Sequence, residues 1–238
     1  MKVATILAAS ALVVSLPGAT RLTAQASTTG TRLGSMSSRS PADTLANGLP
    51  RDVAVKLRPV ARLWRYGLPR FAVDSLVSGG ASAVRADFEW GGKDARDIGD
   101  RGLDVWSPDS ARWLNHDYFI EAGAEGGSVE FGGDVDSAPV LGDVKRDSVG
   151  RLDFRGTSCA FDGAWWIDNS RFVLIGNTEA DLDTTGNREF SLDLYDLHAM
   201  RRSRWLGRPL GDAQFARYHA ACDSSLRVLY RRNLARRK

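Results

Sequence analysis

Short apolar segments separated by polar turns dominate the chain from residue 71 onward. Runs rich in Val, Phe, Trp, Leu and Ile alternate with Gly, Asp, Asn and Ser at intervals of roughly ten residues. This rhythm predicts a mainly β domain, an antiparallel meander of strands. The predicted strands cover residues 71–77, 84–90, 103–106, 112–120, 137–144, 151–154, 164–167, 171–175, 190–197 and 204–206.

The hydrophobic period changes after Pro209. Apolar and thiol side chains now recur at spacings of three and four, which places them on one face of a helix: Phe215, Tyr218, Cys222, Leu226 and Leu229. We therefore expect a C-terminal α-helix over about residues 212–235, with Asp212 as its N-cap. The arginines at its end favour the helix dipole and are expected to be solvated.

The first 26 residues have the layout of a secretory signal peptide. Lys2 precedes a weakly polar run that ends near Leu16, and residues 24–26 have the small-residue pattern of a cleavage site. The run is shorter than the roughly 20 residues of a membrane span. We expect cleavage, export to the periplasm or the extracellular space, and no stable membrane span afterwards. A retained anchor is the alternative, because Arg21 lies close to the expected cut.

Residues 27–50 predict a flexible tether before a single β-rich domain over residues 51–238. The segment holds nine Ser or Thr, three Gly and two Pro. Such a composition buries too little apolar surface to offset the entropy of ordering the chain.

Two segments of the predicted domain resemble each other. Residues 106–114 align with residues 166–174 after one deletion: each has a Trp, a turn with Asp and Ser, an Arg and then an aromatic residue. Downstream, residues 142–145 align with residues 195–198 around a shared Asp. The sequence therefore predicts two repeat units, over about residues 100–155 and 160–207.

At these residues the chain resembles the TolB-like class of β-propeller repeat. That class carries a Trp-Ser-Pro-Asp-Gly turn, and residues 106–110 here read Trp-Ser-Pro-Asp-Ser. The second copy has no proline. The resemblance covers about residues 100–207 and implies blade-like units of antiparallel strands. Because a closed propeller needs about four or more blades, two units predict an incomplete propeller or stacked sheets.

Charge is unevenly distributed along the chain. The net charge is +3, but the last eight residues contain five basic side chains, and Lys2 and Arg21 fall in the predicted signal peptide. Nucleic-acid binding needs a basic patch with interleaved aromatic residues on the folded body. No such patch is visible along the sequence, so we expect no nucleic-acid partner.

The only two cysteines are Cys159 and Cys222. In an oxidising compartment a pair of cysteines predicts a disulfide. Closing a loop of this length would contribute roughly 4 kcal/mol if the geometry permits. Two buried free thiols are an equally weighted alternative, because sequence gives no separation between the two Cα atoms.

Motifs for catalysis and metal binding are weak. His116, His198 and His219 lack the spacing of a zinc site. Ser158 lies in a Gly-x-Ser-x-Ala segment, but a strand and not a helix is expected after it, so a nucleophile elbow is not supported.

An acidic loop gives the best candidates for a metal site. Asp181 and Asp183 alternate ahead of Gly186 as in a calcium loop, yet Leu192 stands where a bidentate Glu is required. A polar hairpin tip explains the same residues. Asp134, Asp136 and Ser137 occupy the corresponding insertion of the first unit and have the same two interpretations. No cofactor is predicted.

These observations favour a non-catalytic binding or interaction module. Its loops over residues 122–137 and 178–189 would form one face for an unidentified protein or small-molecule ligand. The competing hypothesis is an exported hydrolase that uses dispersed acidic residues, which would show as a pocket with convergent carboxylates of shifted pKa. A purely structural envelope protein is the third.

Overall fold

The computed structural model describes residues 43–84, 87–91, 102–117, 120–125, 128–133, 136–156, 160–179 and 188–236. The predicted signal peptide and most of the predicted tether lie outside these residues. The end of the predicted tether is nevertheless part of the fold. Leu49 is completely buried, and the Asn47 side-chain amide donates to the carbonyls of Val73 and Leu76, both at 3.1 Å. Ordered structure therefore begins before residue 51.

Two short helices follow, α1 (Arg51–Lys56) and α2 (Arg58–Gly67). Val60 and Trp64 lie on the buried face of α2. The predicted strand over residues 71–77 is wrong, because this segment forms the 3₁₀ turn η2 (Val73–Ser75) and strand β1 begins only at Val77.

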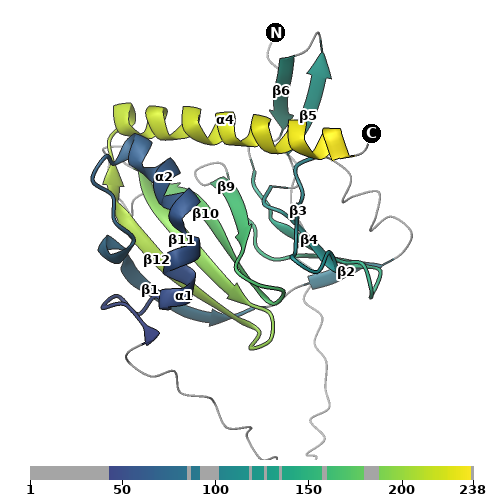
Figure 1. Ribbon diagram of the computed structural model, residues 1–238, viewed down its shortest axis with the longest axis horizontal. Coiled ribbons are helices and arrows are strands. Elements are labelled where there is room, and N and C mark those ends of the chain that lie inside the picture. The colour runs from purple at the N-terminus through teal and green to yellow at the C-terminus, as the bar shows by residue number, and fades with distance from the viewer. Residues whose placement is uncertain are drawn as a thin grey trace, which may run out of the picture. The chain divides into compact units, whose positions relative to one another are not determined.

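The strands form two five-stranded antiparallel sheets, as the predicted mainly β class requires (Figure 1). Sheet I has the order β2 (Asp87–Gly91), β8 (Ser148–Arg151), β7 (Val140–Asp143), β4 (Arg112–Asn115) and β3 (Val105–Trp106). Sheet II has the order β1 (Val77–Ala83), β12 (Arg201–Leu210), β11 (Arg188–Asp196), β10 (Arg171–Glu179) and β9 (Ala160–Trp166). A separate hairpin joins β5 (Ile120–Glu125) and β6 (Ser128–Gly133). Among the described strands, neither sheet closes into a barrel.

The segments that the sequence aligns occupy equivalent positions in the two sheets. In each sheet four strands follow in chain order, and one upstream strand pairs with the last of them. Asp143 accepts hydrogen bonds from the amides of residues 145 and 146, and Asp196 accepts the same pair from residues 198 and 199. Asp147 and Met200, which end these two turns, share a left-handed φ of 47°.

One cross-strand pair differs between the two units, and the larger side chain in sheet I is matched by a smaller partner. In sheet II Phe172 pairs with Tyr195, and their rings stack at 4.9 Å. The equivalent pair in sheet I is Trp113 and Gly142. A Cβ on Gly142 would lie 2.0 Å from the Trp113 ring, so only glycine fits beneath the larger indole.

Sheet II lies between sheet I and the helices. Phe172 and Leu174 of β10 belong to the apolar cluster shared with Leu114 and Leu141 of sheet I. The intervening Val173 and its neighbours on the opposite face pack with the helices instead. This alternation follows from the two-residue period of a strand, and it makes sheet II the central layer.

The predicted C-terminal helix is present as α4 (Asp212–Arg236). Its buried side chains recur every fourth residue: Tyr218, Cys222, Leu226 and Tyr230. The cap differs from the prediction. The Gly211 amide donates to the Gln214 side chain at 3.2 Å, which is the reciprocal half of a capping box, and Asp212 lies inside the first turn. No helix in the described part of the chain has the length and apolar character to cross a membrane.

The first repeat turn provides a test of local strain. Ser110 has a φ of 54°, a left-handed conformation that glycine adopts without penalty. Ser110→Gly is therefore expected to raise the free energy of unfolding by about 0.5–1 kcal/mol. Urea unfolding measures the change. Ala111→Gly, at a neighbouring position without a positive φ, is the control and should lower stability. Equal losses in both variants would contradict the interpretation.

Candidate functional site

A groove of about 1240 Å³ opens between α2, α4 and strands β3 and β9. β3 and β9 are the edge strands of sheets I and II, so the groove follows the line where the two repeat units meet. Its lining includes arginines of α2 and α4, aromatic residues, two buried polar side chains, and aliphatic and serine side chains, most of them from α4.

Five arginines border the groove, three from α2 and two from α4: Arg58, Arg62, Arg65, Arg217 and Arg232. All five are exposed. Within the described ranges none of them forms an ion pair; Arg65 and Arg217 donate instead to backbone carbonyls, at 3.3 and 3.4 Å. Among the described residues that line the groove, Asp162 is the only carboxylate. The groove therefore carries a strong excess of positive charge.

Aromatic rings form much of the wall. Trp106 and Tyr66 are 42% and 55% exposed, and Trp165 and Trp166 are half-buried. The Trp166 indole N–H donates to the Val105 carbonyl at 2.8 Å, a bond that joins sheet II to sheet I. The groove thus offers large flat apolar surfaces beside its cations.

Asp162 on β9 lies at the base of the groove and is buried. Its carboxylate accepts hydrogen bonds from the Asn177 amide, at 2.9 and 3.1 Å, and from the Tyr218 hydroxyl at 2.8 Å. Burial raises the pKa of Asp162, and these hydrogen bonds oppose the rise only in part. Burial also raises the pKa of Cys222, so its thiol stays protonated and is not a nucleophile at neutral pH.

His116 follows β4 and also lines the groove, although its side chain is completely buried. Within the described part of the chain, neither Nδ1 nor Nε2 has a hydrogen-bond partner. Burial lowers the pKa of His116 from 6.5 to about 4, so the imidazole is neutral at physiological pH. The groove therefore contains one buried polar group whose hydrogen-bonding capacity is unused.

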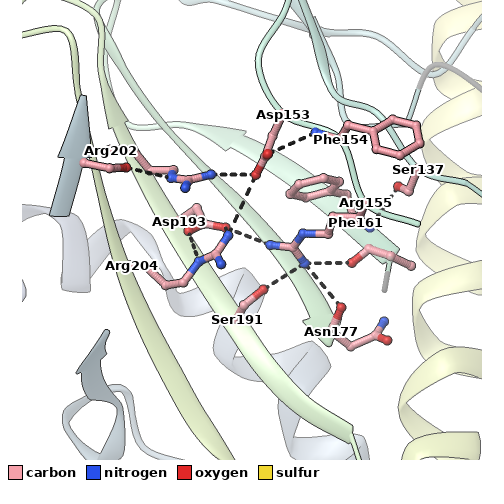
Figure 2. A network of polar contacts seen from close by, with 12 residues as sticks. Ser137, Asp153, Phe154, Arg155, Phe161, Asn177, Ser191, Asp193, Arg202 and Arg204 are labelled. Carbon is pink, nitrogen blue, oxygen red and sulfur yellow. Dashed lines mark hydrogen bonds and ion pairs between the residues drawn. The ribbon is translucent and has the colours of Figure 1, made fainter. Parts of the chain in front are cut away.

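A buried ion-pair network connects the two sheets (Figure 2). Arg155, which follows the last strand of sheet I, donates to Asp193 of β11 at 2.9 Å and to Ser191 at 3.1 Å. Its guanidinium lies 3.8 Å from the ring centroid of Phe161. Asp193 also accepts from Arg204 of β12 at 2.7 Å, so both of its oxygens are bonded.

A second part of the network extends toward sheet I. The Ser137 hydroxyl donates to Asp117 at 2.7 Å and accepts from the Phe161 amide at 3.1 Å. Asp153 pairs with Arg202 of β12 at 2.5 Å. These contacts hold the connection between the repeat units in place. They do not form a reactive centre, because every group in them is hydrogen-bonded to another part of the fold.

Of the two cysteines of the predicted disulfide, the structure describes Cys222 alone. Cys222 is a free, buried thiol in the apolar layer beneath α4, and Cys159 lies outside the described residues. Its place on the buried stripe makes Cys222 a small core residue. Cys222 thus matches the free-thiol alternative, while the pairing with Cys159 stays a prediction.

The other candidates are placed as follows. Asp181, Asp183 and Ser158 lie outside the described residues. Within those residues no group of three or more His, Cys, Asp or Glu is arranged to hold a metal ion. His198 is a turn residue whose amide donates to Asp196.

The described parts of the two predicted binding loops do not meet. The β5–β6 hairpin packs through Val129 and Phe131 on Leu226 and Tyr230 of α4. At the other insertion, Arg188 stacks 4.8 Å from the ring centroid of Phe215, also on α4. Residues 215 and 230 are separated by about 22 Å along a helix that rises 1.5 Å per residue. The described ends of these loops therefore contact α4 at two separate places, and the single binding face that they were predicted to form stays a prediction.

Sequence reasoning missed the groove. It found no basic patch with interleaved aromatics, whereas the structure assembles one from α2, β9 and α4, which are far apart in the sequence. One signal was available: Arg58, Arg62 and Arg65 are spaced four and three residues apart and so share a helix face. That the protein has no nucleic-acid partner stays a prediction, but the lack of a basic, aromatic patch no longer supports it.

Comparison of the chain with protein-family models, with curated proteins and with solved structures finds no match. Function has to be inferred from the groove itself.

The ion-pair network predicts a large stability effect. Asp193→Ala leaves Arg155 buried opposite Arg204 with no carboxylate between them. Removing one partner of a buried pair costs about 3–5 kcal/mol, and we expect a loss of that size in chemical denaturation. Asp143 pairs with the exposed Arg146 at 4.0 Å, so Arg146→Met is the control and should change stability by less than about 0.5 kcal/mol. Similar effects for the two variants would contradict the assigned role.

His116 predicts how stability depends on pH. The unfolded chain takes up the His116 proton near pH 6.5, and the folded chain only near pH 4. The contribution of His116 to the free energy of unfolding is therefore fully present above pH 6.5. It is lost as the pH decreases toward 4, by roughly 3 kcal/mol in all, because the unfolded chain binds the proton more tightly. His116→Leu should lack this component. Urea unfolding at pH 7 and pH 4.5 compares the two proteins, and an equal loss in both would refute the assignment.

Proposed function

We propose that this chain is an exported, non-catalytic binding module, built from two TolB-like, blade-type units, and that it holds an anionic ligand in the groove between α2 and α4. The observation that carries the proposal is a set of five exposed arginines, none of them in an ion pair with another described residue, beside a wall of tryptophans. Export rests on the signal-peptide layout of residues 1–26.

The way the two units stack supports the blade-type interpretation. Trp113 and Phe172 are equivalent in the two repeats, yet Phe172 faces sheet I, while Trp113 belongs to a separate cluster with Val140 and Val149. The face of sheet I that meets sheet II instead carries Leu114 and Leu141. One face of each unit thus packs on the opposite face of the next, as repeated units do, and the helices cover the final face as a cap.

The electrostatics support an anionic ligand. Each guanidinium offers several N–H donors in a planar fork that fits carboxylate, sulfate or phosphate groups. The arginines stand on both walls, so a ligand between α2 and α4 meets cations on two sides. Their charge also attracts anions over distances of about a Debye length, roughly 8–10 Å at physiological ionic strength.

The hydrolase alternative has weaker support. Hydrolysis by carboxylates, as in glycosidases, uses two carboxyl groups about 5–10 Å apart across the substrate. Asp162 is the one carboxylate that lines the groove among the described residues, and both of its oxygens already accept hydrogen bonds. Its raised pKa is explained by burial.

Substitution of the α2 arginines tests the proposal. Calorimetry of the purified protein with polyphosphate, an alginate hexasaccharide, hexaglutamate and single-stranded oligothymidylate should give saturable, salt-sensitive binding of at least one probe. Arg58→Gln, Arg62→Gln and Arg65→Gln combined should weaken that binding by about tenfold or more, because charge-assisted hydrogen bonds are lost.

The matched control removes the same charge elsewhere. Arg146, Arg201 and Arg208 are exposed and lie outside the groove lining, so their combined change to Gln should alter the affinity by less than about threefold. Equal weakening by both triple variants would indicate non-specific attraction, and no binding of any probe would reject the anion site.

A further inference from the structure

The groove is not lined by cations alone, because a buried histidine is also part of its wall. His116 lines the groove with a side chain that is 0% exposed, and neither imidazole nitrogen has a hydrogen-bond partner in the described structure. A buried polar group without partners is costly; Trp64 and Asn115 also have such an atom in the described structure, but of these three residues only His116 lines the groove. At the wall of a cavity, it indicates a position where a bound molecule supplies the missing hydrogen bonds.

We propose that the ligand is an acidic saccharide: its carboxylate or sulfate groups contact the arginines, its sugar rings lie against the tryptophans, and a hydroxyl group bonds to His116. This inference rests on the proposed function and names the ligand class of the same groove.

A hydroxyl is the group that matches His116. A neutral imidazole presents one N–H donor and one acceptor nitrogen, and a hydroxyl both accepts and donates. A carboxylate or phosphate can only accept, so it would leave the second nitrogen unpaired and would lie in a buried site without a counter-charge. The anionic groups of the ligand therefore belong with the arginines, and its hydroxyls with the buried histidine.

The aromatic wall favours sugar rings. Trp106 is 42% exposed inside the groove, although a free indole face in water is unfavourable. A pyranose ring has a face of C–H groups with partial positive charge, and this face complements the negative face of an indole. The same ring carries the hydroxyl groups that His116 requires.

The size of the groove favours an oligomer. Its volume of about 1240 Å³ exceeds the roughly 300–1,000 Å³ of pockets for single small ligands. Arg58, Arg62 and Arg65 lie within eight residues of α2, and the seven steps from Arg58 to Arg65 correspond to on the order of 10 Å. Charges repeated along a uronic-acid chain can meet such a row in succession. An acidic peptide has the charges but neither the ring hydroxyls nor a reason for the unpaired imidazole.

Three probes of equal length separate these properties. An alginate hexasaccharide has six carboxylates and ring hydroxyls, acetylated and amidated hexaglutamate has six carboxylates without hydroxyls, and maltohexaose has hydroxyls without charge. In calorimetry we expect alginate to bind at least about tenfold more tightly than hexaglutamate and maltohexaose. If hexaglutamate or oligothymidylate binds as tightly as alginate, the inference of a saccharide ligand is overturned and the anion site stands. If no polyanion binds, the proposed function itself is rejected.

Two variants test the residues. His116→Leu should weaken alginate binding by about tenfold, leave hexaglutamate binding unchanged, and unfold at the same or a higher urea concentration than the wild type, because no hydrogen bond within the protein is lost. Trp106→Leu should also weaken alginate binding, and because Trp106 is partly exposed this variant tests the inference even where His116→Leu folds poorly.

Phe154→Leu is the matched control, since Phe154 is 49% exposed and lies outside the groove lining. It should bind alginate like the wild type. Alginate affinities that are unchanged in both His116→Leu and Trp106→Leu, or equally weakened in all three variants, would overturn the inference.

Discussion

The structure depends on the buried pair of Arg155 and Asp193. Both side chains are nearly or completely withdrawn from solvent, at 7% and 0% exposure, and charges in such a place are tolerated only when every donor and acceptor is matched. The match is supplied by Ser191, by the Arg204 guanidinium and by backbone carbonyls. Arg155 follows the last strand of sheet I, whereas Asp193 belongs to sheet II. The hydrogen bonds of this pair therefore fix how one repeat unit lies on the other.

That placement in turn creates the groove. With the sheets in register, edge strands β3 and β9 run close enough for the Trp166 indole to bond to Val105. Helix α4 then contacts both units, through Tyr218 on Asp162 of sheet II and through Asn233 on the carbonyls of Gly102 and Asp104, just before β3. Its arginines and those of α2 border a space that neither repeat unit would form alone. The cationic site is thus a consequence of the inter-unit contact.

Local patterns reveal most strands of the two sheets, but they miss the β5–β6 hairpin, which falls in a predicted loop, and the features that tertiary contacts create. Alternating bulky residues and the turns at Asp143 and Asp196 identify both meanders, because those signals lie within a few residues of each other. Strand β1 has the sequence Val-Ser-Gly-Gly-Ala-Ser-Ala and is exposed at every position, so it has no apolar period to detect. It is a strand because β12 offers an edge for pairing. The arginines of α2 and α4 likewise meet only in three dimensions.

The contrast between Arg155 and His116 gives the strongest reason to regard the groove as functional. Both are buried polar side chains beside the same inter-unit boundary, and the fold satisfies the more costly of the two, a full charge, with several partners. The same fold leaves a neutral imidazole unpaired, although an apolar side chain would fill that position without penalty. A sequence selected for stability alone has no reason to keep histidine there. Local choices that contradict the rest of the fold concentrate at binding sites, and His116 lies on the wall of the groove that also holds the exposed Trp106 and five exposed arginines.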